Sequence, residues 1–213
     1  MSDYFIKDEI ILAQSLREIK VAKTKELLRN TLIDLIEEKG FDAISIRDLT
    51  LKAGLNRGTF YLHYRDKYDL LEKNQNEILI GLNENLKKIQ PIGFEEYYSK
   101  DMIYPPVLHL FYYLMENKRF IKIMISTKGD PSFLKKMKEA IKETFYEKLY
   151  IMDNQYIFED IPDEYTTAFI SSAFFGLIEQ WLESDKQDSP EEMALMHLKM
   201  LKVMKKFISQ IMK

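Results

Sequence analysis

The chain has 213 residues, with 31 lysines and arginines against 34 aspartates and glutamates, three histidines and no cysteine, for a formal net charge of −3 at pH 7. The lack of cysteine excludes disulfides, thiolate metal sites and cysteine nucleophiles. The N-terminus lacks the features of a signal peptide, and no segment reaches the roughly 18 apolar residues of a membrane span. We therefore expect a cytoplasmic protein that does not enter a membrane.

The composition predicts an all-α protein. The chain has only 7 glycines and 6 prolines, is rich in leucine, isoleucine, methionine, lysine and glutamate, and has few alternating β-branched runs. Residues 1–22 carry apolar residues at helical spacing, so we expect a helical N-terminal extension that either forms a separate arm or continues into the next helix. An apolar stripe then predicts a helix over 24–38, which Gly40 ends.

Two short helices are predicted next. Ser45 can cap the backbone N–H of Asp48 while the Asp48 carboxylate reaches back, which opens a helix over 46–52. Asn56 can cap a second helix over 57–63. The two helices are joined across Ala53-Gly54-Leu55, a turn of helix-turn-helix length that includes a glycine. Leu49, Ala53, Leu55 and Phe60 fall where the two helices must touch, and all four are apolar.

The rest of the chain predicts a helical bundle. A long apolar pattern indicates a connecting helix over 68–89, and a capping serine, a first-turn proline and a glutamate mark the helix that begins near 190. The other helices are expected at 107–117, 119–127, 131–152 and 162–183. We divide the chain into the helical extension (1–22), a three-helix domain with the helix-turn-helix (23–72) and a C-terminal helical domain (73–213).

Residues 24–71 carry a specific pattern of residues in order and spacing. It includes Ser45-Ile46-Arg47-Asp48-Leu49, Ala53-Gly54-Leu55, Gly58-Thr59-Phe60-Tyr61, His63-Tyr64 and Lys67-Tyr68-Asp69-Leu70-Leu71. This stretch resembles the N-terminal domain of the tetracycline-repressor (TetR) family, although Leu62 stands where the family often has an aromatic residue. The resemblance implies a dimeric transcription regulator on a palindromic DNA operator, more commonly a repressor than an activator, with a small-molecule effector.

Two segments of the second domain carry a further resemblance. Residues 129–134 and 174–181 resemble the C-terminal domain of a TetR branch that includes activators of dihydroxyacetone metabolism. This resemblance implies a helical domain for ligand binding and dimerisation.

The second short helix is the expected DNA-reading element. A recognition helix presents side chains from its first turns to base edges, and arginine is the usual bidentate partner of guanine, so Arg57 is the candidate for direct readout. Thr59 can contact a thymine methyl or a phosphate. In the family, the positions of Tyr61, His63 and Lys67 contact the DNA backbone. The full predicted DNA-binding set is Ser45, Arg47, Asn56, Arg57, Gly58, Thr59, Tyr61, His63 and Lys67.

His63 of this set and the neighbouring Tyr64 have an alternative interpretation. His63 and Tyr64 can instead close a small hydrophobic core, which we expect for Tyr64 and for Phe60 but not for His63.

The last helix carries two apolar stripes, which need two partners. One stripe can face the protein's own core and the other an identical subunit, with small residues on the preceding helix allowing close approach. The alternative is a helix that is central to a monomer. The predicted dimerisation residues are Ser172, Gly176, Met193, Met196, Met200, Val203 and Phe207. Aromatic residues predicted to line a ligand pocket are Tyr98, Phe111, Tyr112, Phe169, Phe174 and Trp181.

Rival functions have less support in the sequence. His63, His109 and His197 are far apart without an HExxH spacing, and no GxGxxG, P-loop or GxSxG string occurs, so we predict no catalytic residue, metal or cofactor. The remaining alternative to a DNA-binding regulator is a helical scaffold that has lost DNA binding.

Overall fold

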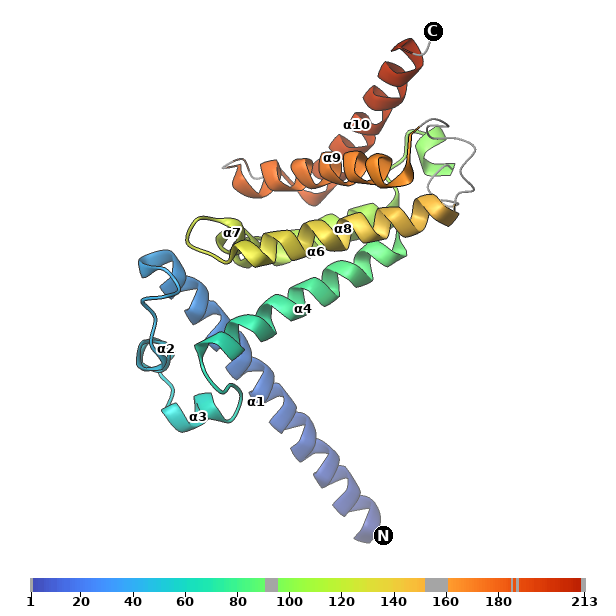
Figure 1. Ribbon diagram of the computed structural model, residues 1–213. Coiled ribbons are helices and arrows are strands. Elements are labelled where there is room, and N and C mark those ends of the chain that lie inside the picture. The colour runs from blue at the N-terminus through green and yellow to red at the C-terminus, as the bar shows by residue number, and fades with distance from the viewer. Residues whose placement is uncertain (1, 91–95, 152–160, 185, 187, 212–213) are drawn as a thin grey trace. The chain divides into compact units, whose positions relative to one another are not determined.

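The computed structural model describes residues 2–90, 96–151, 161–184, 186 and 188–211, and every regular element assigned in this part of the chain is a helix (Figure 1). The predicted all-α class is confirmed. The helices are α1 (Ser2–Lys39), α2 (Ile46–Lys52), α3 (Arg57–Tyr61), α4 (Lys67–Lys88), α6 (Pro105–Glu116), α7 (Lys118–Ile125), α8 (Pro131–Ile151), α9 (Asp163–Glu183) and α10 (Pro190–Ile211).

The chain divides into two compact units, residues 1–74 and 75–213. The division falls within α4, two residues after the boundary expected from the sequence. Each unit has a core of its own, and the two are described separately below.

In the first unit, α1 is one continuous helix, so the N-terminal extension runs directly into the helix predicted over 24–38. Leu28, Leu32 and Ile36 lie one turn apart on α1 and are fully buried. The helix ends at Gly40, whose φ of +75° favours glycine and whose N–H donates to the carbonyl of Ile36 at 2.9 Å. The predicted glycine stop is therefore confirmed.

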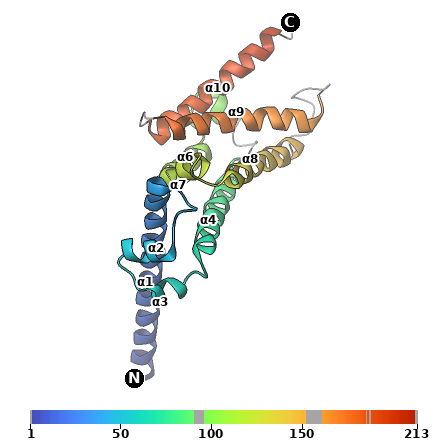
Figure 2. The ribbon, with the colours of Figure 1, turned by 60° about the vertical axis from the view of Figure 1, so that its left-hand side comes forward.

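In the second unit, α8 packs mainly against α9, and α10 packs mainly against α6 (Figure 2). The core between these helices is aromatic. Phe111 of α6 meets Trp181 of α9 edge to face, with ring centroids 5.6 Å apart, and also lies 6.4 Å from Phe174. All three rings are buried, as expected for side chains that supply large apolar areas.

Helices α6 and α10 of this unit have proline as their first residue. Pro105 begins α6, two residues before the start expected from the sequence, because a proline in the first turn lacks only an N–H that would have no partner in the helix. At α10, Ser189 accepts from the Glu192 N–H at 3.2 Å, and Glu192 accepts from the Ser189 N–H at 2.7 Å. This reciprocal cap confirms the predicted start of α10.

His197 of α10 is half-buried and lies against the aromatic core. Its ring lies 5.0 Å from Phe174, and burial lowers its pKa from 6.5 to about 4. Loss of hydration disfavours the charged imidazolium, so the folded protein holds His197 neutral at pH 7.

Stability should therefore fall as the pH drops from about 6.5 towards 4. The unfolded chain protonates His197 in this range while the folded chain does not, so the stabilisation is complete above pH 6.5 and is lost on the way down, by at most about 1.4 kcal/mol per pH unit. Urea unfolding at pH 7.5, 6 and 5 should show a smaller dependence on pH for His197→Gln. An equal dependence in both proteins would contradict the assignment.

Candidate nucleic-acid interface

The start of α2 is held by a capping box. The Ser45 N–H donates to the Asp48 carboxylate at 2.9 Å, and the Asp48 N–H donates to the Ser45 hydroxyl at 3.2 Å. The Lys39 ammonium lies 2.9 Å from the Asp48 carboxylate. This ammonium and the two Ser45 donors hold the pKa of Asp48 well below its usual range. The predicted cap is confirmed. Because the Ser45 hydroxyl also donates to Asp48, this side chain is engaged within the protein.

The turn between α2 and α3 brings the two helices into contact. Gly54 has a φ of +64°, a conformation that side chains with a Cβ rarely adopt, and the Leu55 N–H closes the turn on the Thr50 carbonyl at 2.9 Å. Leu49 and Phe60 are fully buried at the contact, while Leu55 is half-buried. The glycine therefore lets the chain turn sharply enough for these apolar side chains to meet.

Asn56 precedes α3, but its side chain makes no cap hydrogen bond, so that part of the sequence prediction is wrong. The Asn56 side chain is exposed, and only its backbone carbonyl serves the helix, accepting from the Thr59 N–H at 3.0 Å. The start of α3 is therefore positioned by packing of the helix and not by a side-chain cap.

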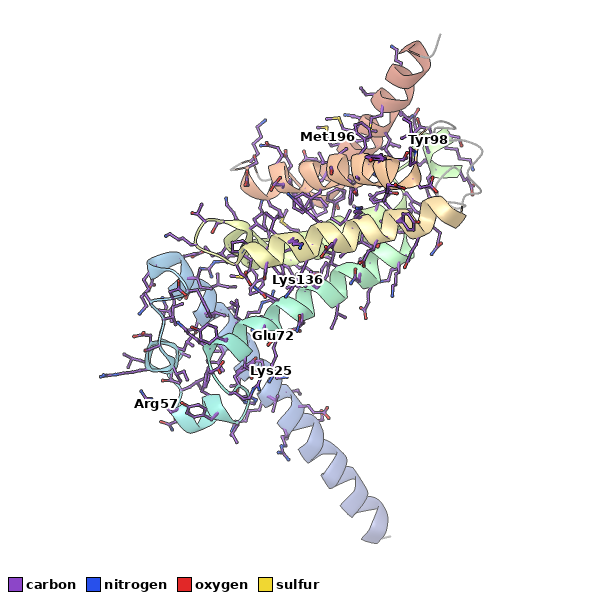
Figure 3. All side chains as sticks on the ribbon, viewed as in Figure 1. Lys25, Arg57, Glu72, Tyr98, Lys136 and Met196 are labelled. Atoms are coloured by element: carbon purple, nitrogen blue, oxygen red, sulfur yellow. The ribbon has the colours of Figure 1, made fainter. Side chains whose placement is uncertain are left out.

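The five-residue helix α3 has one buried and one exposed side (Figure 3). Phe60 is the buried residue, while Arg57, Gly58 and Tyr61 are exposed. Leu62, directly after the helix, is 80% exposed. The helix ends two residues before the predicted end at His63. Arg57 therefore stands in the first turn of α3 with its side chain open to solvent, as a base-reading residue requires.

The loop from α3 to α4 is organised by a buried carboxylate. Asp69 accepts from the Arg65 N–H at 2.9 Å and from the Lys73 ammonium at 3.0 Å, and these donors lower its pKa. Lys73 also donates to the His63 carbonyl at 3.1 Å. Tyr64 is buried, which confirms its expected core role, and His63 is half-buried.

Lys67 joins the start of α4 to the loop between α1 and α2. Its ammonium donates to the carbonyls of Phe41 at 3.1 Å and Asp42 at 2.9 Å, and it lies 4.8 Å from the centre of the Phe41 ring. An ammonium has three N–H donors, so one remains for a phosphate. The sequence suggested only a DNA contact for Lys67 and missed this structural role.

A groove lies beside α3 within the first unit. Its volume is about 600 Å³, and it is lined from α3 and its C-terminal end by Thr59, Leu62 and His63. The opposite wall comes from α1, through Arg17, Lys20, Val21, Thr24 and Lys25. We call this space the α1–α3 groove. None of the α1 residues was in the predicted site, although residues 15–29 contain five basic against two acidic residues, which is the available signal.

The predicted dimerisation residues do not all lie on one surface. Ser172 and Gly176 of α9 are exposed, and so are Met196, Met200 and Val203 of α10. Met193, however, is only 5% exposed and belongs to the core of its own protomer. The side chain of Phe207 lies outside the described residues. The prediction that Met193 lies on the dimer surface is wrong, because helical spacing alone does not show which side of α10 faces the bundle.

The predicted pocket residues have different surroundings. Phe111, Phe174 and Trp181 pack on one another in the core, as described above. Tyr112 donates to Glu191, and Phe169 is 60% exposed. Tyr98 is half-buried, with the Lys202 ammonium 5.6 Å from the centre of its ring. The predicted ligand pocket stays a prediction, because aromatic composition does not specify which rings fill a core and which line a cavity.

Two further properties concern the described part of the chain. No helix there is long and apolar enough to cross a membrane. No group of three histidine, aspartate or glutamate side chains among these residues is arranged to hold a metal ion.

Comparison with known proteins finds two adjacent matches along the chain. Residues 29–73 match the family described as bacterial regulatory proteins, tetR family, and residues 101–203 match a transcriptional regulator C-terminal region of the same group. The chain is 28% identical over 182 residues to the uncharacterized HTH-type transcriptional regulator YwcC from Bacillus subtilis, covering 76% of this chain and 78% of that protein. The expected link to dihydroxyacetone metabolism stays a prediction.

Solved structures share the fold. A TetR transcriptional regulator from Streptococcus agalactiae matches with a TM-score of 0.56 and 24% identity, covering 88% of this chain and 98% of that one. NalD, described as the secondary repressor of the MexAB-OprM multidrug efflux pump in Pseudomonas aeruginosa, matches with a TM-score of 0.58 and 18% identity, covering 84% and 93%.

Replacing Lys67 should weaken the first unit itself. Lys67→Ala removes two charge-assisted hydrogen bonds to backbone carbonyls, so we expect the free energy of unfolding to fall by about 1 to 2 kcal/mol. Lys23→Ala, an exposed position on α1, should change it by less than about 0.5 kcal/mol. Urea unfolding followed by circular dichroism measures both. Equal stability of the two variants would show that the Lys67 contacts contribute nothing.

Proposed function

Because this chain belongs to the TetR family of bacterial regulatory proteins, we propose that it represses transcription as a homodimer on a palindromic operator, with its DNA affinity modulated by a small-molecule effector. The chain is a DNA-binding transcriptional regulator and not an enzyme. The observation that carries the proposal is the exposure of Arg57 on α3 beside the fully buried Phe60, which fixes the rotation of this short helix.

Arg57 is the proposed base-reading residue. An arginine in the leading turn of a recognition helix can donate two parallel hydrogen bonds to O6 and N7 of guanine, which discriminates against other bases by about 1 to 3 kcal/mol. Thr59, Tyr61 and His63 are placed to contact phosphates or base edges beside it, and the remaining N–H of Lys67 is available for a phosphate. Arg47, which is exposed at the start of α2, is a further proposed phosphate contact.

The proposed dimer uses the exposed face of α9 and α10. On α10, Met200 and Val203 are exposed apolar residues, and Val203 is 63% exposed. On α9, Ser172 and Gly176 are small, so a second copy can approach closely. An isologous contact through this face has two-fold symmetry, which matches the symmetry of a palindrome whose half-sites lie about 34 to 36 Å apart.

Repression is proposed as the outcome of binding. NalD, a structural neighbour, is described as a secondary repressor, which supports repression by this chain.

The proposed effector acts through the second unit. Phe111, Phe174 and Trp181 fill the space between α6 and α9. A ligand enters this part of the bundle only if these rings separate, so binding there would move the helices. Such coupling is typically worth about 1 to 3 kcal/mol in operator affinity.

Selection from a pool of random DNA with the purified protein at about 150 mM salt tests the proposed function. Sequencing of the retained fragments should reveal an inverted repeat. Retention of all sequences alike, or of none, would contradict operator recognition. DNA affinity that is unchanged in Arg57→Ala and Lys67→Ala would favour the alternative of a helical scaffold.

Arg57→Ala and Lys67→Ala should affect operator binding differently. Arg57→Ala should relax base preference at one position of each half-site, with a loss of about 1 to 3 kcal/mol there. Lys67→Ala should weaken all sequences about equally and lower the slope of log affinity against log salt concentration by about 1. Binding titrations against single-base variants of the selected site measure both effects. Identical profiles for the two variants would reject this division of roles.

Charges placed on the outer face of α10 should separate the dimer. In Met200→Glu/Val203→Glu, like charges meet across the two-fold axis, so we expect monomers in analytical ultracentrifugation and a loss of operator affinity of at least about a hundredfold. Lys142→Glu, at an exposed position of α8, is the control and should remain dimeric. A double variant that is still dimeric would place the interface elsewhere.

A further inference from the structure

The N-terminal part of α1 continues past α3 as a helix (Figures 1 and 2). The α1–α3 groove is lined by one face of α1 and by Thr59, Leu62 and His63. The α1 wall of this groove follows the spacing i, i+3, i+4, i+7, i+8 of a single helix face. Three of its five residues are basic, namely Arg17, Lys20 and Lys25, and we call them the α1 basic stripe. Both acidic residues of this segment, Glu18 and Glu26, lie outside the groove lining.

The α1 basic stripe differs from other basic residues of the first unit in its partners. Lys39 pairs with Asp48, Lys52 with Glu38, and Lys73 with Asp69. Arg17, Lys20 and Lys25, in contrast, are exposed and have no ion pair with any carboxylate in the described part of the chain. Uncompensated positive charge therefore gathers on the α1 wall that faces the end of the recognition helix.

The dimensions of the stripe suit one strand of a nucleic acid. Lys25 lies eight positions after Arg17, which corresponds to about 12 Å along the helix axis at 1.5 Å per residue. A DNA strand carries one phosphate per 3.4 Å of duplex axis, so a stripe that lies along this axis spans about three or four phosphates. The other wall supplies the hydroxyl of Thr59 and the imidazole of His63, which are also groups that contact phosphates.

We propose that the α1 basic stripe is a second DNA-binding surface, which holds the phosphate backbone in the α1–α3 groove next to the bases read by α3. This inference rests on the proposed operator binding and extends it to the N-terminal extension. The extension then adds affinity without base preference, because it contacts phosphates only. The operator segment covered by each protomer becomes longer than the segment that α3 reads.

The test replaces the stripe as a unit. Arg17→Gln/Lys20→Gln/Lys25→Gln removes three positive charges and keeps good helix formers at exposed positions, so the thermal unfolding curve should stay unchanged. For the selected operator, the slope of log affinity against log salt concentration should fall in magnitude by about 2 to 3. The dissociation constant at about 150 mM salt should rise at least tenfold, and hydroxyl-radical footprints should lose protection at their outer edges.

Two controls separate a local contact from a general effect of charge. Lys23 lies on the same helix but outside the lining of the α1–α3 groove. Lys23→Gln should therefore lower the salt slope of operator affinity by less than Lys20→Gln alone. Lys135→Gln/Lys142→Gln/Lys186→Gln removes three charges from the second unit and should leave the footprint intact. Equal losses in the stripe variant and in this second-unit variant would overturn the inference.

The outcomes also distinguish this inference from the proposed function. If the stripe variant keeps the wild-type slope and footprint while Arg57→Ala loses its base preference, the inference is wrong and operator recognition stands. If the wild-type protein selects no sequence at all, both fail. A shortened footprint with base preference retained supports the inference.

Discussion

A helix of five residues makes too few backbone hydrogen bonds to be stable by itself in water, so α3 depends on its surroundings for both its existence and its orientation. The full burial of Phe60 anchors α3, because it sets which side of the helix faces inward. The buried carboxylate of Asp69 and the ammonium of Lys73 then fix the chain that leaves α3. Loss of this packing would leave Arg57 without a defined direction, even with its side chain intact.

Charge in the first unit is divided between two tasks. Ion pairs such as Lys39 with Asp48 connect α1 to α2, and Lys67 connects α4 to the loop after α1. The ion pairs are exposed to solvent and salt, so they contribute positioning more than stability. The half-buried Lys67 also stabilises the unit through its two carbonyl contacts. The basic residues on α1 beside α3 lack such partners among the described carboxylates, and that difference assigns them to an external anion.

In the second unit, the residues that fill the core differ in type from those on the exposed side of α9 and α10. Large aromatic rings of α6 and α9 interlock in the core, whereas glycine, serine and flexible methionines occupy the exposed side of α9 and α10. Close packing inside makes the bundle rigid, and small or flexible residues outside permit a second copy to approach. A movement that separates the inner rings would be transmitted along these helices, which is the physical basis for the proposed effector response.

Local patterns in the sequence determined the helices, most of their limits and the capping boxes at Ser45 and Ser189, because these features arise from residues within four positions of each other. The same patterns placed Arg57 in the first turn of α3. Tertiary structure decided the features that join distant segments. Lys67 donates to backbone carbonyls about twenty-five residues away in the chain. The Asn56 side chain makes no cap hydrogen bond, and Met193 is buried in the core. The α1–α3 groove belongs to the same class, since helical periodicity defines a face of α1 but not which neighbour that face meets.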